Sequence, residues 1–260
     1  AVADPHQQHI PMQLDRVGPI DHCLPLVGRG AVGQVHELEV ARHEESPVAF
    51  DGRVSDHAGD YLAVVESNVS PTSKYNLVID RSDTLVVKLD EAGDAVSSLR
   101  MDWTNAAGEP GEPYRSLREF SNNEDGWYGA YVRVLAPSGA QLVTASGQAS
   151  EPIRAVEGVS EEAGRAVFAN YLFMPPGGST LTYLWTAPGA AQTREDGWSY
   201  ELLLQKQPGA RPMPQSVTID LPDGAVVEQV SDGLAVEDGR VSGEFTLDQD
   251  LELQVDYSLP

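Results

Sequence analysis

From Tyr61 onward, apolar residues recur at every second position in short runs, and this alternation limits the fold more than any other feature. Successive side chains of a strand point to opposite faces, so each run predicts a strand with one buried face. Gly, Pro, Asp or Asn separates most runs, and nothing convincingly helical lies between them. The chain is therefore expected to be all-β, with antiparallel sandwiches and no β-α-β units. The runs cover residues 61–66, 75–80, 84–90, 96–103, 130–136, 140–145, 165–173, 179–186, 199–206, 216–221, 225–230, 240–247 and 250–257.

A set of turn residues occurs twice in the same order. The stretches YVRVLAPSGAQLVTASG (131–147) and VTIDLPDGAVVEQVSDG (217–233) both contain a strand, Pro-x-Gly-Ala, a second strand and Gly. Each is followed by a Gly-Arg that opens another strand, and each copy ends with an aromatic residue, Trp185 or Tyr257, three positions before a proline. Gly after Pro supplies a positive φ, so the markers are explained by turn chemistry. Their shared order predicts two related sandwiches.

The predicted organisation has three parts. An irregular or partly helical segment, residues 1–57, contains all six histidines, and its residues 31–45 could form an amphipathic helix. Two tandem immunoglobulin-like antiparallel sandwiches follow, the first at 58–190 and a smaller one at 191–260.

The tetrapeptide Glu-Asp-Gly-Trp also occurs twice, at 124–127 and 195–198. Its copies lie ten and twenty-four residues before the two Pro-x-Gly-Ala turns, so they are out of phase with the duplication. We interpret them as two separate turns that begin strands, with Asp-Gly closing the turn and Trp covering the next strand's apolar face.

The charge balance excludes several classes of partner. The chain has 17 Lys and Arg against 40 Asp and Glu, a formal net charge of -23. Phosphate backbones and anionic lipid surfaces are repelled by such a charge, so no nucleic-acid partner is expected. One cysteine, Cys23, permits no internal disulfide. There is no Gly-x-Ser-x-Gly elbow and no glycine-rich phosphate loop, and no catalytic set is assigned.

Histidines near the N-terminus give one metal hypothesis. His6 and His9 lie three residues apart, and His36 and His43 lie seven apart. Imidazole is a common zinc ligand, but these spacings match no zinc template such as His-Glu-x-x-His. We therefore expect no bound metal or cofactor and keep these four residues as the zinc alternative.

A calcium hypothesis rests on SNNEDG, residues 121–126, where Asn123 and Asp125 place oxygen ligands as in the first half of an EF-hand loop. Val132 stands where the loop's bidentate Glu is required. An EF-hand is excluded, and Asn123 and Asp125 stay candidates only for a site shared with another loop.

Three aromatic residues, Trp127, Tyr128 and Trp198, lie in or beside predicted turns. An exposed ring there could stack on the face of a sugar, which makes the three residues candidates for ligand binding. The alternative is that each ring fills the end of a sandwich core.

Several stretches resemble a known family in their order along the chain: GDYLAVVESNVSPTSKYNLVIDRS (59–82), YVRVLAPSGAQLVTASG, MPPGGSTLTYLWTAP and LLLQKQPG (202–209). They are similar to the C-terminal part of a bacterial family catalogued as domain-of-unknown-function family four thousand and twelve. The most specific parts are Asp60 to Asn68, the pair Lys74 and Tyr75, and Gln-Lys-Gln-Pro-Gly at 205–209, whereas ESNVSPTSKY departs from the family's loop.

What the resemblance implies is a location. The family's members look like membrane-anchored proteins with a large extracytoplasmic region, which implies the bacterial cell surface or cell wall. Contact with the membrane is expected only through an N-terminal anchor that this sequence lacks. The family has no established activity, so the resemblance implies no catalytic residue.

These observations lead to an expected function. We expect a non-enzymatic extracytoplasmic module that binds or spaces components of the bacterial cell envelope, with an envelope polysaccharide or protein as partner. One alternative is a carbohydrate-binding module for a cell-wall polymer. Another is a fragment of an envelope enzyme with a metal site in the histidine-containing segment.

Overall fold

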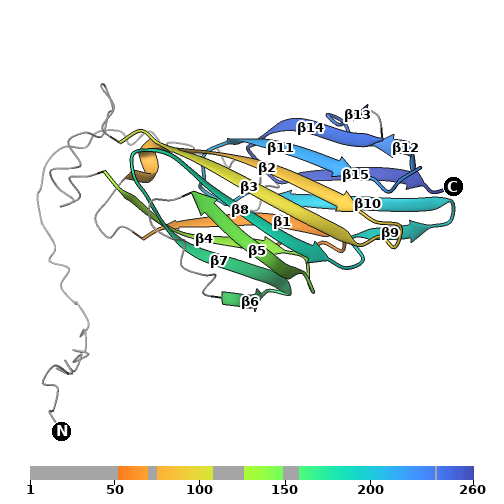
Figure 1. Ribbon diagram of the computed structural model, residues 1–260, viewed down its shortest axis with the longest axis horizontal. Helices are drawn as coiled ribbons and strands as arrows, with labels where there is room; N and C mark the ends of the chain where they lie inside the picture. The colour runs from red at the N-terminus through yellow and green to blue at the C-terminus, as the bar shows by residue number, and fades with distance from the viewer. Residues whose placement is uncertain (1–51, 70–74, 108–125, 149–157, 238) are drawn as a thin grey trace, which may run out of the picture. The chain divides into compact units, whose positions relative to one another are not determined.

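The computed structural model describes residues 52–69, 75–107, 126–148, 158–237 and 239–260 (Figure 1). The chain separates into two units, Ala1–Glu44 and Glu45–Pro260, and every described residue belongs to the second. The described chain forms strands and a single 3₁₀ turn, η1 (Tyr75–Val78), which confirms the prediction of an all-β fold.

The strands form two mixed sheets, here called sheet A and sheet B. Sheet A contains β1 (Asp60–Asn68), β4 (Tyr128–Ala136), β6 (Gly158–Glu162), β7 (Arg165–Met174), β9 (Ala191–Arg194), β10 (Gly197–Gln205), β12 (Val226–Val230) and β15 (Leu251–Ser258). Sheet B contains β2 (Ile79–Leu89), β3 (Ala95–Asn105), β5 (Gln141–Gln148), β8 (Gly177–Ala187), β11 (Met213–Asp220), β13 (Ala235–Glu237) and β14 (Arg240–Leu247). The order is β12-β15-β10-β1-β4-β7-β6 in sheet A, with β9 paired to β10, and β13-β14-β11-β2-β3-β8-β5 in sheet B.

One strand order occurs twice in these sheets. The first copy consists of β3-β8-β5 in one sheet and β4-β7-β6 in the other, and the second consists of β10-β15-β12 and β11-β14-β13. Both Pro-x-Gly-Ala turns have Gly at φ 79° and a bond from the Ala N–H to the Pro carbonyl at 3.1 Å. The strand after each turn has a β-bulge at the same place, Leu142/Thr144 and Val227/Gln229. The repeated order of turns in the sequence therefore coincides with a repeated order of strands.

Two parallel pairs join the copies. β1 lies between β4 and β10 and is parallel to β10, while β2 lies between β3 and β11 and is parallel to β11. Each sheet is consequently continuous across both predicted sandwiches (Figure 1). The boundaries at residues 58, 190 and 191, and the immunoglobulin-like character of each half, stay predictions.

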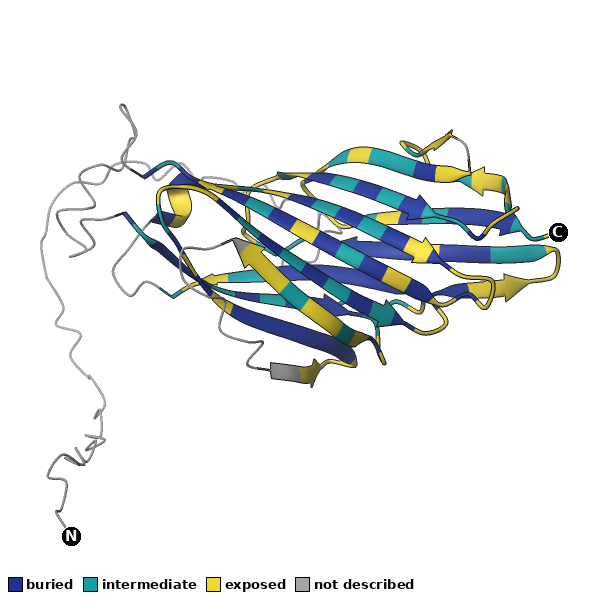
Figure 2. Cartoon of the chain, viewed as in Figure 1, coloured by how far each residue is buried: buried dark blue, intermediate teal, exposed yellow. Residues whose placement is uncertain are grey.

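The main core lies between the sheets and is formed by the inward positions of the alternating strands (Figure 2). β3 and β8 show the alternation clearly, with every second residue buried. Its largest fully buried side chains include Trp103, Trp185 and Phe168. Burial of this apolar area is the main force that holds the sheets together.

Residues 52–58, which precede β1, have no regular structure and pack on the outer face of sheet A. Arg165 Nη2 donates hydrogen bonds to the carbonyls of Ser55 (2.9 Å) and His57 (3.0 Å), and its guanidinium lies 4.1 Å from the centre of the Tyr61 ring. Val54 packs against a small apolar cluster on the same face. The segment before β1 is thereby fixed to the sheet.

Candidate functional site

A cavity beside buried charged groups lies where β1 ends and β2 begins, next to the connection from β10 to β11. Its volume is about 670 Å³, within the range of about 300–1,000 Å³ typical of small-molecule sites. Its wall combines carboxylates, amides and hydroxyls with apolar groups: Glu66, Asn68, Asn76, Leu77, Ile79, Asp80, Arg81, Ser82, Asp102, Thr104, Tyr128, Gln207, Pro208, Gly209, Ala210, Arg211, Pro212, Met213 and Pro214. We call this cavity the end pocket.

Glu66 of β1 holds its carboxylate between the two sheets. Tyr128 Oη donates to Oε1 at 2.7 Å, and Oε2 accepts from Trp103 Nε1 at 2.9 Å and from Arg81 Nη1 at 3.3 Å. Burial and the charge of Glu66 raise the pKa of Tyr128, so the phenol stays protonated and donates. An ionised carboxylate can accept about four hydrogen bonds. Three donors orient the Glu66 carboxylate, so it can accept one more.

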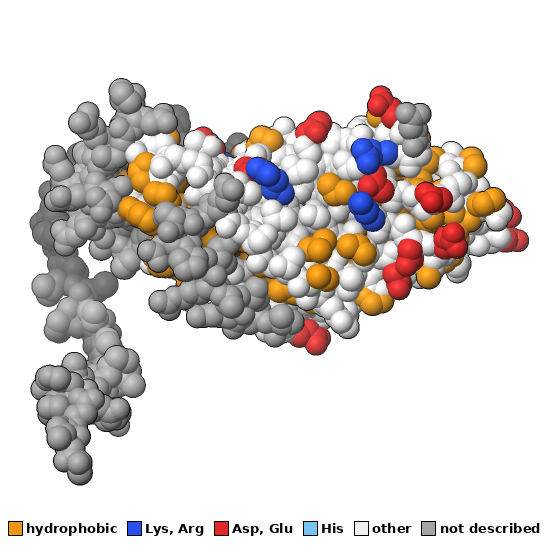
Figure 3. Space-filling model, in the orientation of Figure 1, with side chains coloured by type: hydrophobic (Ala, Val, Ile, Leu, Met, Phe, Trp, Pro, Cys, Tyr) orange, Lys and Arg blue, Asp and Glu red, His pale blue; other side chains and the backbone are white. Residues whose placement is uncertain are grey.

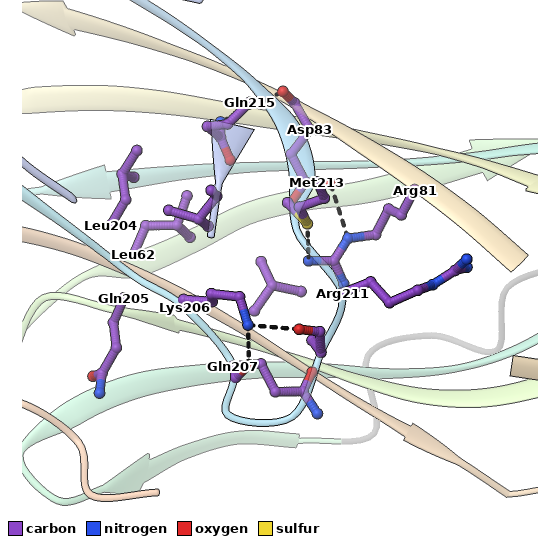
Figure 4. A pocket seen from close by; sticks show the side chains of 13 residues that line it. Leu62, Arg81, Asp83, Leu204, Gln205, Lys206, Gln207, Arg211, Met213 and Gln215 are labelled. Carbon is purple, nitrogen blue, oxygen red and sulfur yellow. Dashed lines mark hydrogen bonds and ion pairs between the residues drawn. The ribbon is translucent and has the colours of Figure 1, made fainter. Parts of the chain in front are cut away.

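Arg81 of β2 connects Glu66 to a second, more deeply buried acid, Asp83. Figure 4 shows Arg81 between Asp83 and Met213. Its Nε lies 3.1 Å from Asp83 Oδ1, an ion pair without hydrogen-bond geometry, and its Nη2 donates to Met213 Sδ at 3.1 Å. The Asp83 side chain is 1% exposed. A cavity of about 20 Å³, close to the size of one water, lies beside these groups and shares Arg81 and Met213 with the end pocket.

The connection from β10 to β11 is fixed to both central strands by side chains. Gln207 pairs with the backbone of Glu66, accepting from its N–H at 2.8 Å and donating to its carbonyl at 3.0 Å. Arg211 donates to the carbonyl of Ile79 and to Asp80 Oδ1, the latter at 3.0 Å. The wall of the end pocket is therefore held in place without any ligand.

Two of the sequence stretches named in the resemblance meet at this site. Gln207 of the Gln-Lys-Gln-Pro-Gly stretch bonds to Glu66 of the Asp60–Asn68 stretch at the end pocket, and Gln205 bonds to Tyr61 on the outer face of sheet A. They do so although the two stretches are about 140 residues apart in the chain.

Four carboxylates lie around the end pocket and the small cavity. The ion pairs are Asp80 with Arg211, Asp102 with Arg100, and Glu66 and Asp83 both with Arg81. The hydrogen bond from Arg100 lowers the pKa of Asp102, which keeps that group ionised. When Asp83 is also ionised, the four carboxylates lie near three guanidinium groups and the Lys206 ammonium, but Glu66 and Asp83 share a single ion-pair partner, Arg81.

Burial raises the pKa of Asp83 from about 3.8 to about 6, and the charge of Arg81 offsets only part of this effect. The pKa of Asp83 is higher in the folded state than in the unfolded state. The contribution of the Asp83 carboxyl to the free energy of unfolding is therefore fully present below about pH 3.8 and is lost as the pH rises through about 6.

Asp83→Asn cannot ionise at this position and therefore tests the pH dependence. The free energy of unfolding of the variant minus that of the wild type should increase by about 2 kcal/mol from pH 4 to pH 8. Urea unfolding of both proteins at several pH values measures this difference. A constant difference across the range would show that Asp83 titrates normally.

The structure separates the aromatic candidates. Tyr128 is 1% exposed and belongs to the site through its hydroxyl. Trp127 precedes β4 and is half-buried. Trp198 is also half-buried and packs against the core. The pairing of β1 with β10 places Trp198 near the start of β1, and the pairing of β1 with β4 places Tyr128 near the end of β1. The three rings therefore do not form one surface.

The metal candidates lie outside the described residues. This holds for His6, His9, His36 and His43 and for Asn123 and Asp125. Among the residues that the structure describes, no three His, Cys, Asp or Glu side chains gather in a way that could hold a metal ion. In the same part of the chain, no helix has the length and apolar character needed to cross a bilayer.

Comparison with known proteins gives distant structural neighbours only. No protein family and no curated protein matches the sequence. A mutant M1 zinc metallopeptidase from Deinococcus radiodurans has a TM-score of 0.34 at 12% identity, over 68% of this chain and 42% of that one. Native leukotriene A4 hydrolase from Saccharomyces cerevisiae has a TM-score of 0.41 at 13% identity, over 74% and 31%. The yeast hydrolase in complex with bestatin has 0.37 at 12%, over 82% and 33%. This chain thus spans less than half of each.

These neighbours require a correction. The expected non-enzymatic module that binds or spaces envelope components is contradicted, because the solved structures that the chain resembles are enzymes. At TM-scores of 0.34 to 0.41 the likeness carries no argument for a particular activity of this chain. The family resemblance and the location outside the bacterial cytoplasm stay predictions.

Proposed function

We propose that the chain binds a small organic amine in the end pocket. The observation that carries this proposal is the Glu66 carboxylate, which three donors from both sheets hold at the pocket wall with room for one more hydrogen bond. Such an oriented acceptor suits an ammonium group, since charge-assisted hydrogen bonds are the strongest that proteins form.

The charges favour a cation over an anion. The wall of the end pocket contains three carboxylates and two guanidinium groups, and Glu66 shares its ion-pair partner Arg81 with Asp83, so a positive charge on the ligand suits this wall. The net charge of -23 adds a long-range field that attracts cations and repels anions. Carboxylate and phosphate ligands are therefore disfavoured at this site.

The remaining wall suits an apolar body on the ligand. Leu77 is 39% exposed, and Ile79, Pro208, Pro212 and Met213 line the same cavity. Covering an exposed apolar side chain contributes about 25 cal/mol per Å² removed from water. The ligand class that fits is an amine with an aliphatic chain or ring.

Three probes of equal size test the proposal: n-hexylamine, 1-hexanol and hexanoate, each titrated calorimetrically into the protein at pH 7.5. We expect measurable binding of the amine alone. Glu66→Gln loses the charge but keeps one acceptor oxygen for Trp103, while its NH2 can donate to the Tyr128 hydroxyl, so it should weaken amine binding about tenfold or more.

The matched control is Asp220→Asn. Asp220 pairs with Arg240 at the other end of β11, so its removal changes the net charge without touching the end pocket. Its affinity for hexylamine should stay within about twofold of the wild type. Equal binding of all three probes, or equal losses in both variants, would contradict an amine site at Glu66.

A further inference from the structure

The edges of the two sheets are protected unequally. The edge strands among the described residues are β6, β12 and the four-residue β9, which contains Arg194, in sheet A, and β5 and β13 in sheet B. β6 and β12 have five residues each and β13 has three, and each contains at least one glutamate. β5 has eight residues, QLVTASGQ, without a charge or a proline. Short length and charge are the usual means of preventing edge-to-edge pairing, and β5 has neither.

The neutral region extends beyond the edge strand. The neighbouring strand β8, GGSTLTYLWTA, also has no charged residue, although 22% of the chain is charged. In Figure 3 the described surface over β5 and β8 shows hydrophobic side chains (orange) and other uncharged atoms (white). Acidic (red) and basic (blue) side chains lie over other strands. Val143 on β5 is 59% exposed, an apolar side chain directly at the edge.

We propose that β5 pairs antiparallel with β5 of a second copy of this chain. A copy with a net charge of -23 is repelled by most of the surface, so association must use a neutral side, and β5 with β8 provides one. Two identical strands that pair across a two-fold axis bring the same residues together. Here these include Thr144 and Ser146, which are exposed and uncharged and can hydrogen-bond across the axis.

The bulge in β5 limits the pairing but does not prevent it. It lies between Leu142 and Thr144, and from Thr144 to Gln148 the strand pairs regularly with Leu184 to Thr180 of β8. Five residues therefore present a regular outer edge. Such an interface is smaller than the roughly 1,200 Å² of stable complexes, so the expected Kd is on the order of 100 μM.

Analytical ultracentrifugation from about 5 μM to about 1 mM protein tests the pairing. Because the copies repel each other, raising NaCl from about 20 mM to about 300 mM should strengthen the dimer severalfold. Thr144→Lys with Ser146→Lys places like charges opposite each other at the exposed edge and should raise the Kd more than about tenfold. Val96→Lys with Thr193→Lys adds the same charge at exposed positions of β3 and β9, away from β5, and should leave the Kd within about twofold.

Hydrogen exchange locates the contact independently. At concentrations where the dimer dominates, the amides of residues 144–148 should exchange more slowly than in dilute protein. A protein that stays monomeric at about 1 mM in high salt overturns the proposal. A dimer that the β5 lysines do not weaken, or one without protection at 144–148, also overturns it. Circular dichroism verifies that both lysine variants are folded.

Discussion

Trp103→Ala is expected to lower the free energy of unfolding by about 3–5 kcal/mol. Trp103 is 2% exposed, belongs to the core between the sheets, and donates through Nε1 to Glu66 at 2.9 Å. Alanine leaves a large cavity and removes one of the three donors that hold the Glu66 carboxylate. Urea unfolding followed by far-ultraviolet circular dichroism measures the loss.

Trp103→Phe separates packing from hydrogen bonding, since phenylalanine retains most of the ring but has no N–H donor. Its loss should be about 1.5–3 kcal/mol, the usual effect of removing one hydrogen bond to a charged group. If alanine cost less than about 1 kcal/mol, the ring could not fill the core as described.

Gly197→Ala is expected to cost about 3 kcal/mol or more. Gly197 begins β10 with φ 153°, and a Cβ on it would lie 2.5 Å from the backbone carbonyl oxygen of Tyr257 on the paired strand β15. Real Cβ contacts are not this short, so the pairing of the two strands has to shift. Thermal and urea unfolding of the variant measure the cost.

Gly189→Ala is the matched control. Gly189 also has a positive φ, 63°, but a Cβ there would meet no atom within 4 Å. Only backbone strain remains, about 1–2 kcal/mol. Equal losses at the two positions would contradict the close approach of Gly197 to β15.

Most of the strands could be predicted from the alternation of apolar residues. Twelve of the thirteen predicted runs fall in strands, and the run 75–80 is η1 followed by the start of β2. β6, β9 and β13 were not predicted, because they are short and mostly exposed. Short exposed strands bury no apolar face, so no periodicity marks them.

The parallel pairs of β1 with β10 and β2 with β11 could not be predicted. They join residues more than 130 positions apart, such as Asp60 with Leu202, and no local pattern records such a contact. The pairing depends on which strand edges stay free once the neighbouring strands have formed.

The candidate site has one signal in the sequence, which is a charged residue at an inward strand position. In β1 the inward positions are Leu62, Val64 and then Glu66, and in β2 Arg81 and Asp83 precede buried Leu85. A charged residue that continues an inward apolar series has to find a partner inside the protein. Among 40 acidic residues these few were not distinguished, because identifying them requires knowing which face of each strand is buried.

The placement of β1 and β2 between the two copies has a consequence for the order of folding. Both strands are synthesised early, but one edge of each stays unpaired until β10 and β11 have left the ribosome. A partly made chain therefore exposes two central strand edges, which is the condition under which nascent β-proteins aggregate. Folding that depends on such distant contacts is slow, on the order of milliseconds to seconds. A chaperone that shields strand edges during synthesis should accordingly raise the yield of folded protein.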